Sequence, residues 1–177
     1  MEFLDEVQFF RFDGINYLKL FEIIRNETLW EKTMRSRWTA SYGKPYNYND
    51  TFYDFKGVPE YLDEIIDLID VKLGYRPNNC LINFYNNRDS KMGYHSDNID
   101  ILEKDTGITI LSLGAKRVMK FKNIKDSQTI EVVLDPNSFF HMSSELQKEW
   151  KHSVLSVHDG INETFFERIS VTFRRVI

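Results

Sequence analysis

Two arginines and two hydroxyl residues alternate with apolar residues near the end of the chain, in the stretch RISVTFR. Successive side chains of a β-strand leave opposite faces of the sheet. If this stretch is a strand, one face carries Ile169, Val171 and Phe173, and the other carries Arg168, Ser170, Thr172 and Arg174. That polar face suits either a solvated edge strand or a pocket for a small dianion, because a guanidinium can form two parallel hydrogen bonds with a carboxylate.

A second stretch, GYHSDN, contains a histidine and a carboxylate that could bind the same metal ion. In an extended segment His95 and Asp97 point to the same side, since they are two positions apart. Iron(II) oxygenases use two histidines and one carboxylate and leave three coordination positions open. A second histidine is therefore needed. We favour His152, which begins a strand shortly before the two-arginine stretch, over His141 and His158.

The stretch NFY places a side-chain amide and a phenol two positions apart, at Asn83 and Tyr85. On one face of a strand, both could donate hydrogen bonds to a carboxylate. An ordinary strand with one polar face has the same pattern, so the role of this pair depends on what lies beside it.

Helical periodicity appears only in the first half of the chain. Apolar residues recur at helical spacing over residues 15–29, and Asp13 could cap that helix. A second helix is predicted over residues 59–74, with Pro59 in its first turn and Gly74 at its C-terminal end. An aromatic, turn-rich stretch, residues 37–55, lies between them.

The second half of the chain has the texture of short strands. Strands are predicted over residues 80–85, 108–114, 117–123, 129–135, 138–143, 152–157 and 168–177. Many short strands in one domain favour a sandwich or barrel, so the predicted fold class is α+β.

Composition limits the classes of protein that the chain can represent. It has 177 residues, 42% of them apolar and 15% aromatic, which indicates one globular domain with a sizeable core. The only cysteine, Cys80, excludes an internal disulfide framework and a Cys-rich zinc site. We see no signal peptide and no membrane-spanning run, and expect a monomer in a reducing intracellular compartment, cytoplasm or nucleus. The net charge of −4 counts against a nucleic-acid ligand unless the contacts are local.

Taken in order, these motifs resemble the AlkB family of iron(II)/2-oxoglutarate dioxygenases. The resemblance lies in CLINFYNNRDSKMGYHSDN, ILSLGAKRVMKF, MSSELQKEWKHSV and RISVTFR, and more weakly in RWTASYGKPYNY. It implies a double-stranded β-helix, or jelly roll, over residues 80–177, with N-terminal helices and a substrate lid over residues 1–79. The chain departs from the family in having Asn98, Ile99 and Asp100 where further acidic residues often follow, and Ser170 where many members have Asn.

The resemblance also assigns roles to residues. It implies that iron(II) is bound by His95, Asp97 and His152, which would be the catalytic centre. It implies a 2-oxoglutarate pocket built from Asn83, Tyr85, Arg168, Ser170, Thr172 and Arg174. Molecular oxygen would be the third reactant.

The reaction that the family implies is oxidative dealkylation of N-alkylated bases in DNA or RNA, which releases an aldehyde, succinate and CO₂. Stacking on the base is expected from Tyr46 and Tyr48 first and Trp38 third, with His95 supporting the opposite face. A local basic patch, Lys32, Arg35, Arg37 and Lys44, could contact phosphates. Two alternatives remain open: the same oxygenase chemistry on a protein side chain or small molecule, and a catalytically silent binding module on the same barrel.

Overall fold

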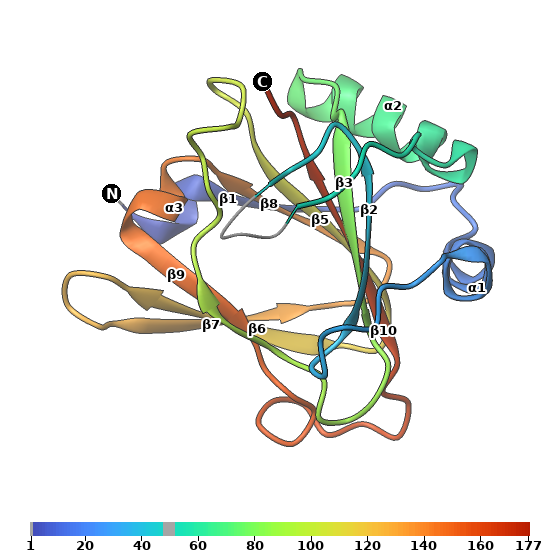
Figure 1. Ribbon diagram of the computed structural model, residues 1–177. Coiled ribbons are helices and arrows are strands. Elements are labelled where there is room, and N and C mark those ends of the chain that lie inside the picture. Colours follow the sequence, from blue (N-terminus) through green and yellow to red (C-terminus); the bar gives the residue numbers. More distant parts are fainter. Residues whose placement is uncertain (1, 48–51) are drawn as a thin grey trace.

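Two antiparallel β-sheets face each other (Figure 1). The computed structural model describes residues 2–47 and 52–177. Within them, the larger sheet has the order β1 (Val7–Phe10), β8 (Ser138–Ser143), β5 (Gly107–Gly114), β10 (Arg168–Arg174), β3 (Asn79–Tyr85), β2 (Trp38–Gly43). The smaller sheet has the order β4 (Met92–His95), β9 (Trp150–Val154), β6 (Arg117–Asn123), β7 (Thr129–Leu134). The α+β jelly roll predicted from the sequence is confirmed.

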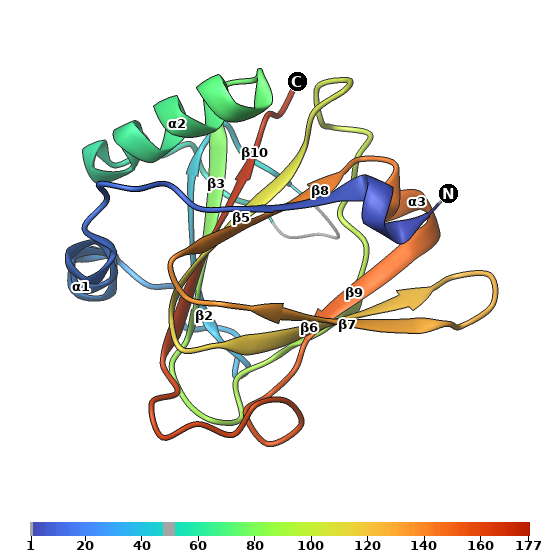
Figure 2. The same ribbon diagram turned by 180° about the vertical axis from the view of Figure 1, so that it is seen from behind.

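Helices cover the face of the larger sheet that points away from the smaller one (Figure 2). Helix α1 spans Tyr17–Glu27, and α2 spans Asp63–Leu73 after the 3₁₀ turn η2 (Glu60–Leu62). The predicted cap Asp13 is wrong: the helix begins later, and the Asn16 side chain accepts a hydrogen bond from the Lys19 amide. Gly74 ends α2 with a φ of 76°, as predicted, because glycine adopts this left-handed conformation without steric cost.

Two further helical segments frame the smaller sheet. The 3₁₀ helix η1 (Phe3–Glu6) places Phe3 against Phe121 and Trp150. The short helix α3 (Leu146–Glu149) leads directly into β9. No helix in the described part of the chain is long and apolar enough to cross a membrane.

Both faces of β10 are buried. Its apolar side chains face the hydrophobic core, and its polar side chains face a cavity and not the solvent. Ile169, Val171 and Phe173 pack under α1 and α2, each 0% exposed. The polar residues of the same strand, Arg168, Ser170, Thr172 and Arg174, line a cavity between the sheets. Each buried apolar side chain contributes roughly 1.5–3 kcal/mol to stability. The apolar face therefore fixes the strand, and the polar face is free to bind a ligand.

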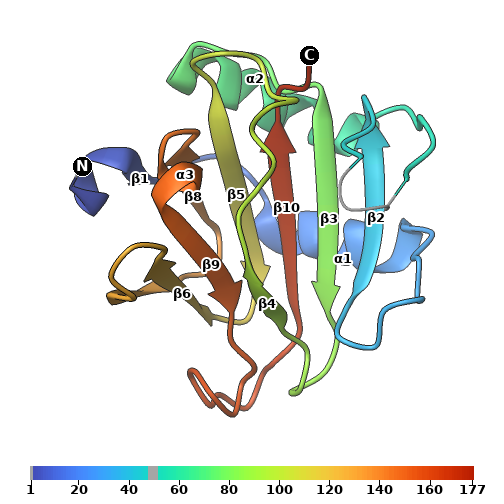
Figure 3. The ribbon, with the colours of Figure 1, turned by 60° about the vertical axis from the view of Figure 1, so that its left-hand side comes forward.

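The register of β10 brings the predicted polar residues side by side. Strand β10 lies between β5 and β3 (Figure 3). Across the β10–β3 pair, Arg168 faces Tyr85 and Ser170 faces Asn83. The polar residues of the two strands therefore form one continuous surface.

Strands β1, β2 and β4 were not predicted. Strand β2 falls in the stretch expected to be irregular, and its small residues Ala40 and Ser41 weaken the strand pattern. It pairs with β3 along its whole length, from Trp38 opposite Phe84 to Gly43 opposite Asn79. The N-terminal half of the chain therefore completes the larger sheet. Strand β4 has four residues including Gly93, and its pairing with β9 is irregular between Met92 and His95.

Candidate metal centre and adjoining pocket

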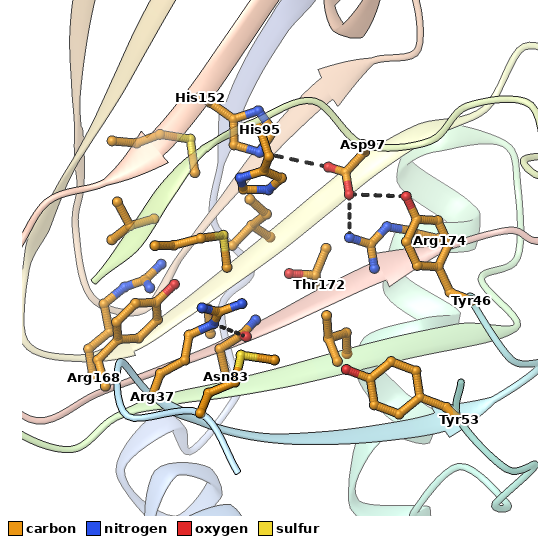
Figure 4. A pocket seen from close by; sticks show the side chains of 18 residues that line it. Arg37, Tyr46, Tyr53, Asn83, His95, Asp97, His152, Arg168, Thr172 and Arg174 are labelled. Carbon is orange, nitrogen blue, oxygen red and sulfur yellow. Dashed lines mark hydrogen bonds and ion pairs between the residues drawn. The ribbon is translucent and has the colours of Figure 1, made fainter. Parts of the chain in front are cut away.

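A cavity of about 280 Å³ lies between the two sheets (Figure 4). Its walls come from both sheets and from the segment around β2. The lining residues are Met34, Arg37, Tyr46, Tyr53, Leu81, Asn83, Tyr85, Met92, His95, Asp97, Ile110, Met119, His152, Val154, Arg168, Ser170, Thr172 and Arg174. All nine residues predicted to bind metal or 2-oxoglutarate are therefore in one cavity.

The three predicted metal ligands converge at one end of this cavity. One ligand atom from each of His95, Asp97 and His152 lies within 4.8 Å of the others. His95 and His152 are cross-strand partners in the β4–β9 pair, with ring centroids 4.3 Å apart. His95 Nδ1 is 2.9 Å from the Gly93 carbonyl oxygen, which can only accept a hydrogen bond. Nδ1 therefore carries the proton, and Nε2 keeps its lone pair for a metal.

The backbone around Asp97 is tied to the start of β9. The Asp97 amide donates to Gln147 Oε1 at 3.0 Å, and Gln147 is only 4% exposed. Ser96 Oγ donates to the Trp150 carbonyl oxygen at 3.1 Å. These contacts hold the Asp97 loop beside the strand that carries His152.

The Asp97 carboxylate is paired with a buried arginine. Arg174 Nη2 lies 2.6 Å from Asp97 Oδ1, while Asp97 Oδ2 is 3.8 Å from His152 Nε2. The guanidinium carbon of Arg174 is 4.1 Å from the Tyr46 ring centroid, and the Tyr46 hydroxyl accepts a hydrogen bond from the Asn98 amide at 2.6 Å. Arg174 thus fixes one carboxylate oxygen and leaves the other facing the histidines.

The electrostatics at this end of the cavity keep the candidate ligands Asp97 and His152 in the protonation states that a metal cation requires. Burial would raise the pKa of Asp97, but the charges of Arg174, His152 and His95 lower it to about 2. Burial, together with the charges of His95 and Arg174, lowers the pKa of His152 to about 3. Near neutral pH the site therefore presents a carboxylate and a neutral imidazole, the forms that bind metal.

Two arginines supply unpaired donors to the rest of the cavity. Arg168 and Arg174 are 1% and 4% exposed. Arg168 Nη2 donates to Ser112 Oγ at 3.0 Å, but its Nε and Nη1 have no partner among the described residues, and neither do Nε and Nη1 of Arg174. Buried donors without partners are costly, so the cavity is complete only with an acceptor. A dicarboxylate fits this donor set, with one group at each end (Figure 4).

Several cavity residues were not predicted as site residues. Arg37, predicted only as part of a basic patch, donates from Nε to Asn83 Oδ1 at 2.8 Å. Because the Asn83 oxygen is thereby occupied, its amide nitrogen is the group available to a ligand. Met34 and Tyr53 line the same cavity. These residues precede or follow β2 without a regular period, so spacing alone gave no signal for them.

The residues expected to stack on a base occupy different places. Tyr46 lines the cavity and is 6% exposed. Trp38 does not line it: its ring packs edge-on against Phe84 on the helix-covered face, with Lys32 Nζ 4.0 Å from its centroid. Tyr48 lies outside the described residues. Of the two candidates that the structure describes, Tyr46 lines the cavity and Trp38 does not.

His141, an alternative ligand in the sequence, lies away from the metal centre. Its Nδ1 is 2.9 Å from Thr109 Oγ1, and burial lowers its pKa to about 4. An unfolded histidine takes up a proton at higher pH than this folded one, so His141 destabilises the fold as pH falls from about 6.5 to about 4. We expect His141→Gln to lose less stability than the parent between about pH 7 and pH 5, measured by urea unfolding.

The exposed His158, changed to Gln, is the matched control for this pH measurement. His152 also has a low pKa and also destabilises the fold as pH falls. Because it is present in the parent and in both variants, its contribution cancels when their stabilities are compared. An unchanged pH dependence in His141→Gln would contradict the assignment.

Comparison with known proteins agrees with this geometry. Residues 12–174 match the family model described as the 2OG-Fe(II) oxygenase superfamily, and the chain therefore belongs to that superfamily. The chain is 26% identical over 153 residues to the rat protein "Alpha-ketoglutarate-dependent dioxygenase alkB homolog 3". It superimposes on a solved structure titled "The structure of OsALKBH1" with a TM-score of 0.72 and 16% sequence identity. The superposition covers 96% of this chain and 98% of that chain. The superfamily implies Fe(II), 2-oxoglutarate and O₂ as cofactors, and the His95–Asp97–His152 cluster could form the iron site.

Two viral proteins are also similar. The chain is 32% identical over 131 residues to the "RNA replication polyprotein" of Citrus leaf blotch virus, and 29% identical over 112 residues to the "RNA-directed RNA polymerase" of Lolium latent virus. The matches cover 73% and 62% of this chain. They cover only 6% of each viral protein. The match to the rat protein covers 79% of this chain and 50% of the rat protein. The chain thus corresponds to a part of these relatives.

Proposed function

We propose that this chain oxidatively dealkylates N-alkylated bases in DNA or RNA, releasing an aldehyde, succinate and CO₂. The observation that carries the proposal is one cavity that contains both a His–Asp–His cluster and two buried arginines with unpaired donors. A catalytically silent barrel would not need this costly arrangement. The names of the viral relatives support including RNA among the substrates.

The metal end is assigned to His95, Asp97 and His152 as the Fe(II) ligands. When bound, the iron supplies the oxidation of the N-alkyl carbon, together with 2-oxoglutarate and oxygen. The protein holds the ligands ready: Gly93 fixes the His95 tautomer, and Arg174 keeps Asp97 ionised and oriented. Binding of Fe(II) then requires little rearrangement of side chains.

The remaining polar residues are assigned to 2-oxoglutarate. Arg174 lies beside Asp97, so we place it at the keto-acid end with the Asn83 amide. Arg168 lies at the other end of the cavity, so we place it with Tyr85 at the distal carboxylate. The hydroxyls of Ser170 and Thr172 lie between them on the same strand face and can donate along the chain of the ligand.

Substrate recognition is assigned to rings and cations around β2. Tyr46 and Tyr48 are proposed to face the base, and Arg37, with Tyr53, borders the same cavity. Trp38 remains a weaker candidate because its ring packs on Phe84. The net charge of −4 favours the alternative substrates, a protein side chain or a small molecule. We also expect a reducing intracellular compartment, which the free, buried Cys80 supports.

Succinate formation across methylated DNA, RNA and nucleosides, with Fe(II) present, tests this function. We expect methylated oligonucleotides to stimulate succinate formation above the substrate-free rate. Tyr48→Ala should reduce the stimulated rate by about 10- to 100-fold, since one stacking ring is worth roughly 1–3 kcal/mol. Its substrate-free rate should persist, because the iron and 2-oxoglutarate residues are unchanged.

Tyr46→Ala and Trp38→Ala belong in the same experiment as separate variants. Tyr46 also contacts Arg174 and the Asn98 amide, so its substrate-free rate must be measured beside the stimulated one. If all three ring variants used methylated oligonucleotides as well as the parent, the stacking assignment would be wrong.

A further inference from the structure

Arg117 is a buried cation that the proposed chemistry does not use. It is the first residue of β6 and only 1% exposed. Met119 and Phe121 follow on the same face of the strand, and Met119 lines the cavity while Phe121 lies beside His152. An arginine on an otherwise apolar, inward-facing row requires an explanation, because a buried charge is costly unless it is paired.

The partners of Arg117 are backbone carbonyls from three separate loops. Its Nη1 donates to the carbonyls of Ser90 at 2.8 Å and Leu155 at 3.4 Å, and its Nη2 donates to those of Asn87 and Phe166, both at 3.1 Å. Asn87 and Ser90 lie in the loop that follows β3, Leu155 lies in the loop that follows β9, and Phe166 lies in the loop that precedes β10. One guanidinium therefore fixes the ends of the three strands that carry Tyr85, His152 and Arg168.

Arg117 also contacts the proposed ligand-binding residues at the far end of the cavity. The guanidinium carbon of Arg117 lies 5.5 Å from the centroid of the Tyr85 ring, and that of Arg168 lies 5.0 Å from the same centroid. Tyr85 is 1% exposed and is the cross-strand partner of Arg168. Within the described residues, Arg117 donates to carbonyls and Arg168 to Ser112 Oγ, and neither forms an ion pair with a carboxylate. Burial and the charge of Arg168 lower the pKa of Arg117 to about 10, which leaves it a cation at neutral pH.

We propose that Arg117 is a positioning residue for 2-oxoglutarate, which fixes Tyr85 and the entry to β10 so that Arg168 can receive the distal carboxylate. The inference rests on the assignment of Tyr85 and Arg168 to that carboxylate. Arg117 does not line the cavity. Its Nη1 and Nη2 donate to backbone carbonyls, and its Nε has no partner among the described residues. It also adds positive charge behind the phenol, which favours a dianion over a neutral molecule in the cavity.

The test is the split between cosubstrate affinity and maximal rate in Arg117→Lys and Arg117→Met. Lysine keeps the charge but cannot reach three loops from one ammonium, so the inference predicts a rise in the KM for 2-oxoglutarate of about tenfold or more in both variants. At saturating 2-oxoglutarate, kcat should stay within about twofold of the parent. The 2-oxoglutarate Kd of the Mn(II)-loaded protein, measured by calorimetry, should rise in parallel, whereas Mn(II) affinity without 2-oxoglutarate should not change.

Arg88→Lys is the matched control. Arg88 joins the same region at the surface, through Asn162 Oδ1 at 2.8 Å and the Glu163 carbonyl at 3.0 Å, without contacting Tyr85. It should leave the 2-oxoglutarate KM unchanged. A purely structural role for Arg117 predicts a lower kcat or less folded protein with an unchanged KM, and that result would overturn the inference. If neither Arg117 variant folds, Arg117 serves folding alone and the inference also fails.

The outcomes also distinguish the inference on Arg117 from the assignment of Arg168 and Tyr85 to the distal carboxylate of 2-oxoglutarate. If Arg168→Lys raises the KM for 2-oxoglutarate but the Arg117 variants do not, only the inference on Arg117 is wrong. If Arg168→Lys has no effect, the pocket assignment fails first.

Discussion

Asp97→Ala is expected to abolish succinate formation and Fe(II) binding. The substitution removes one of the three proposed Fe(II) ligands and leaves the buried Arg174 without its 2.6 Å partner. Breaking a buried ion pair in this way costs about 3–5 kcal/mol, so the free energy of unfolding should fall as well. Equilibrium dialysis measures Fe(II) binding, and urea unfolding measures stability.

Two companion variants separate metal binding from folding. Asp97→Asn keeps a side-chain oxygen for Arg174, so it should retain more stability than Asp97→Ala but still bind Fe(II) poorly. Asp100→Ala removes an exposed carboxylate from the same loop and should change neither property. Full Fe(II) affinity and turnover in Asp97→Ala would rule out this metal centre.

Arg168→Lys is expected to give the second large effect, a rise in the KM for 2-oxoglutarate of about 10- to 150-fold. A hydrogen bond to a charged group is worth about 1.5–3 kcal/mol, and an ammonium cannot reproduce the guanidinium fork. Fe(II) affinity should be unchanged, because Asp97 is held by Arg174 and not by Arg168. Steady-state kinetics with varied 2-oxoglutarate gives the KM.

Arg175→Lys is the control for this experiment. Arg175 pairs with Glu103 outside the cavity, next in sequence to a proposed ligand-binding arginine. A normal 2-oxoglutarate KM in Arg168→Lys would remove Arg168 from the pocket.

The polar residues of β10 and β3 could be predicted from sequence because alternation decides which face each side chain occupies. Whether that polar face met solvent or a cavity could not be read from the strand itself. The answer depends on the second sheet: β9 and β6 cover the cavity and bury Arg168 and Arg174. From the sequence alone, only the resemblance to a family indicated that this polar face meets a cavity.

The residues that escaped prediction depend on contacts between distant segments. Arg37 reaches Asn83 only because β2 pairs with β3, and β2 itself was hidden in an aromatic, turn-rich stretch. The choice of His152 over His141 likewise depends on the register of β4 with β9. Arg117 lies in a strand that was predicted, but its role was not, because its carbonyl partners come from three loops that are distant in sequence.

The central claim, dealkylation of a nucleic-acid base, is tested most directly by counting products from one methylated oligonucleotide. The chain is incubated with Fe(II), 2-oxoglutarate and oxygen, and formaldehyde, unmodified base and succinate are measured together. We predict that formaldehyde and unmodified base appear in equal amounts, match the oligonucleotide-stimulated succinate, and are absent with Asp97→Ala. Succinate formed by the parent chain while methylated DNA and RNA oligonucleotides all remain unchanged would contradict the claim and leave a protein side chain or a small molecule as the substrate.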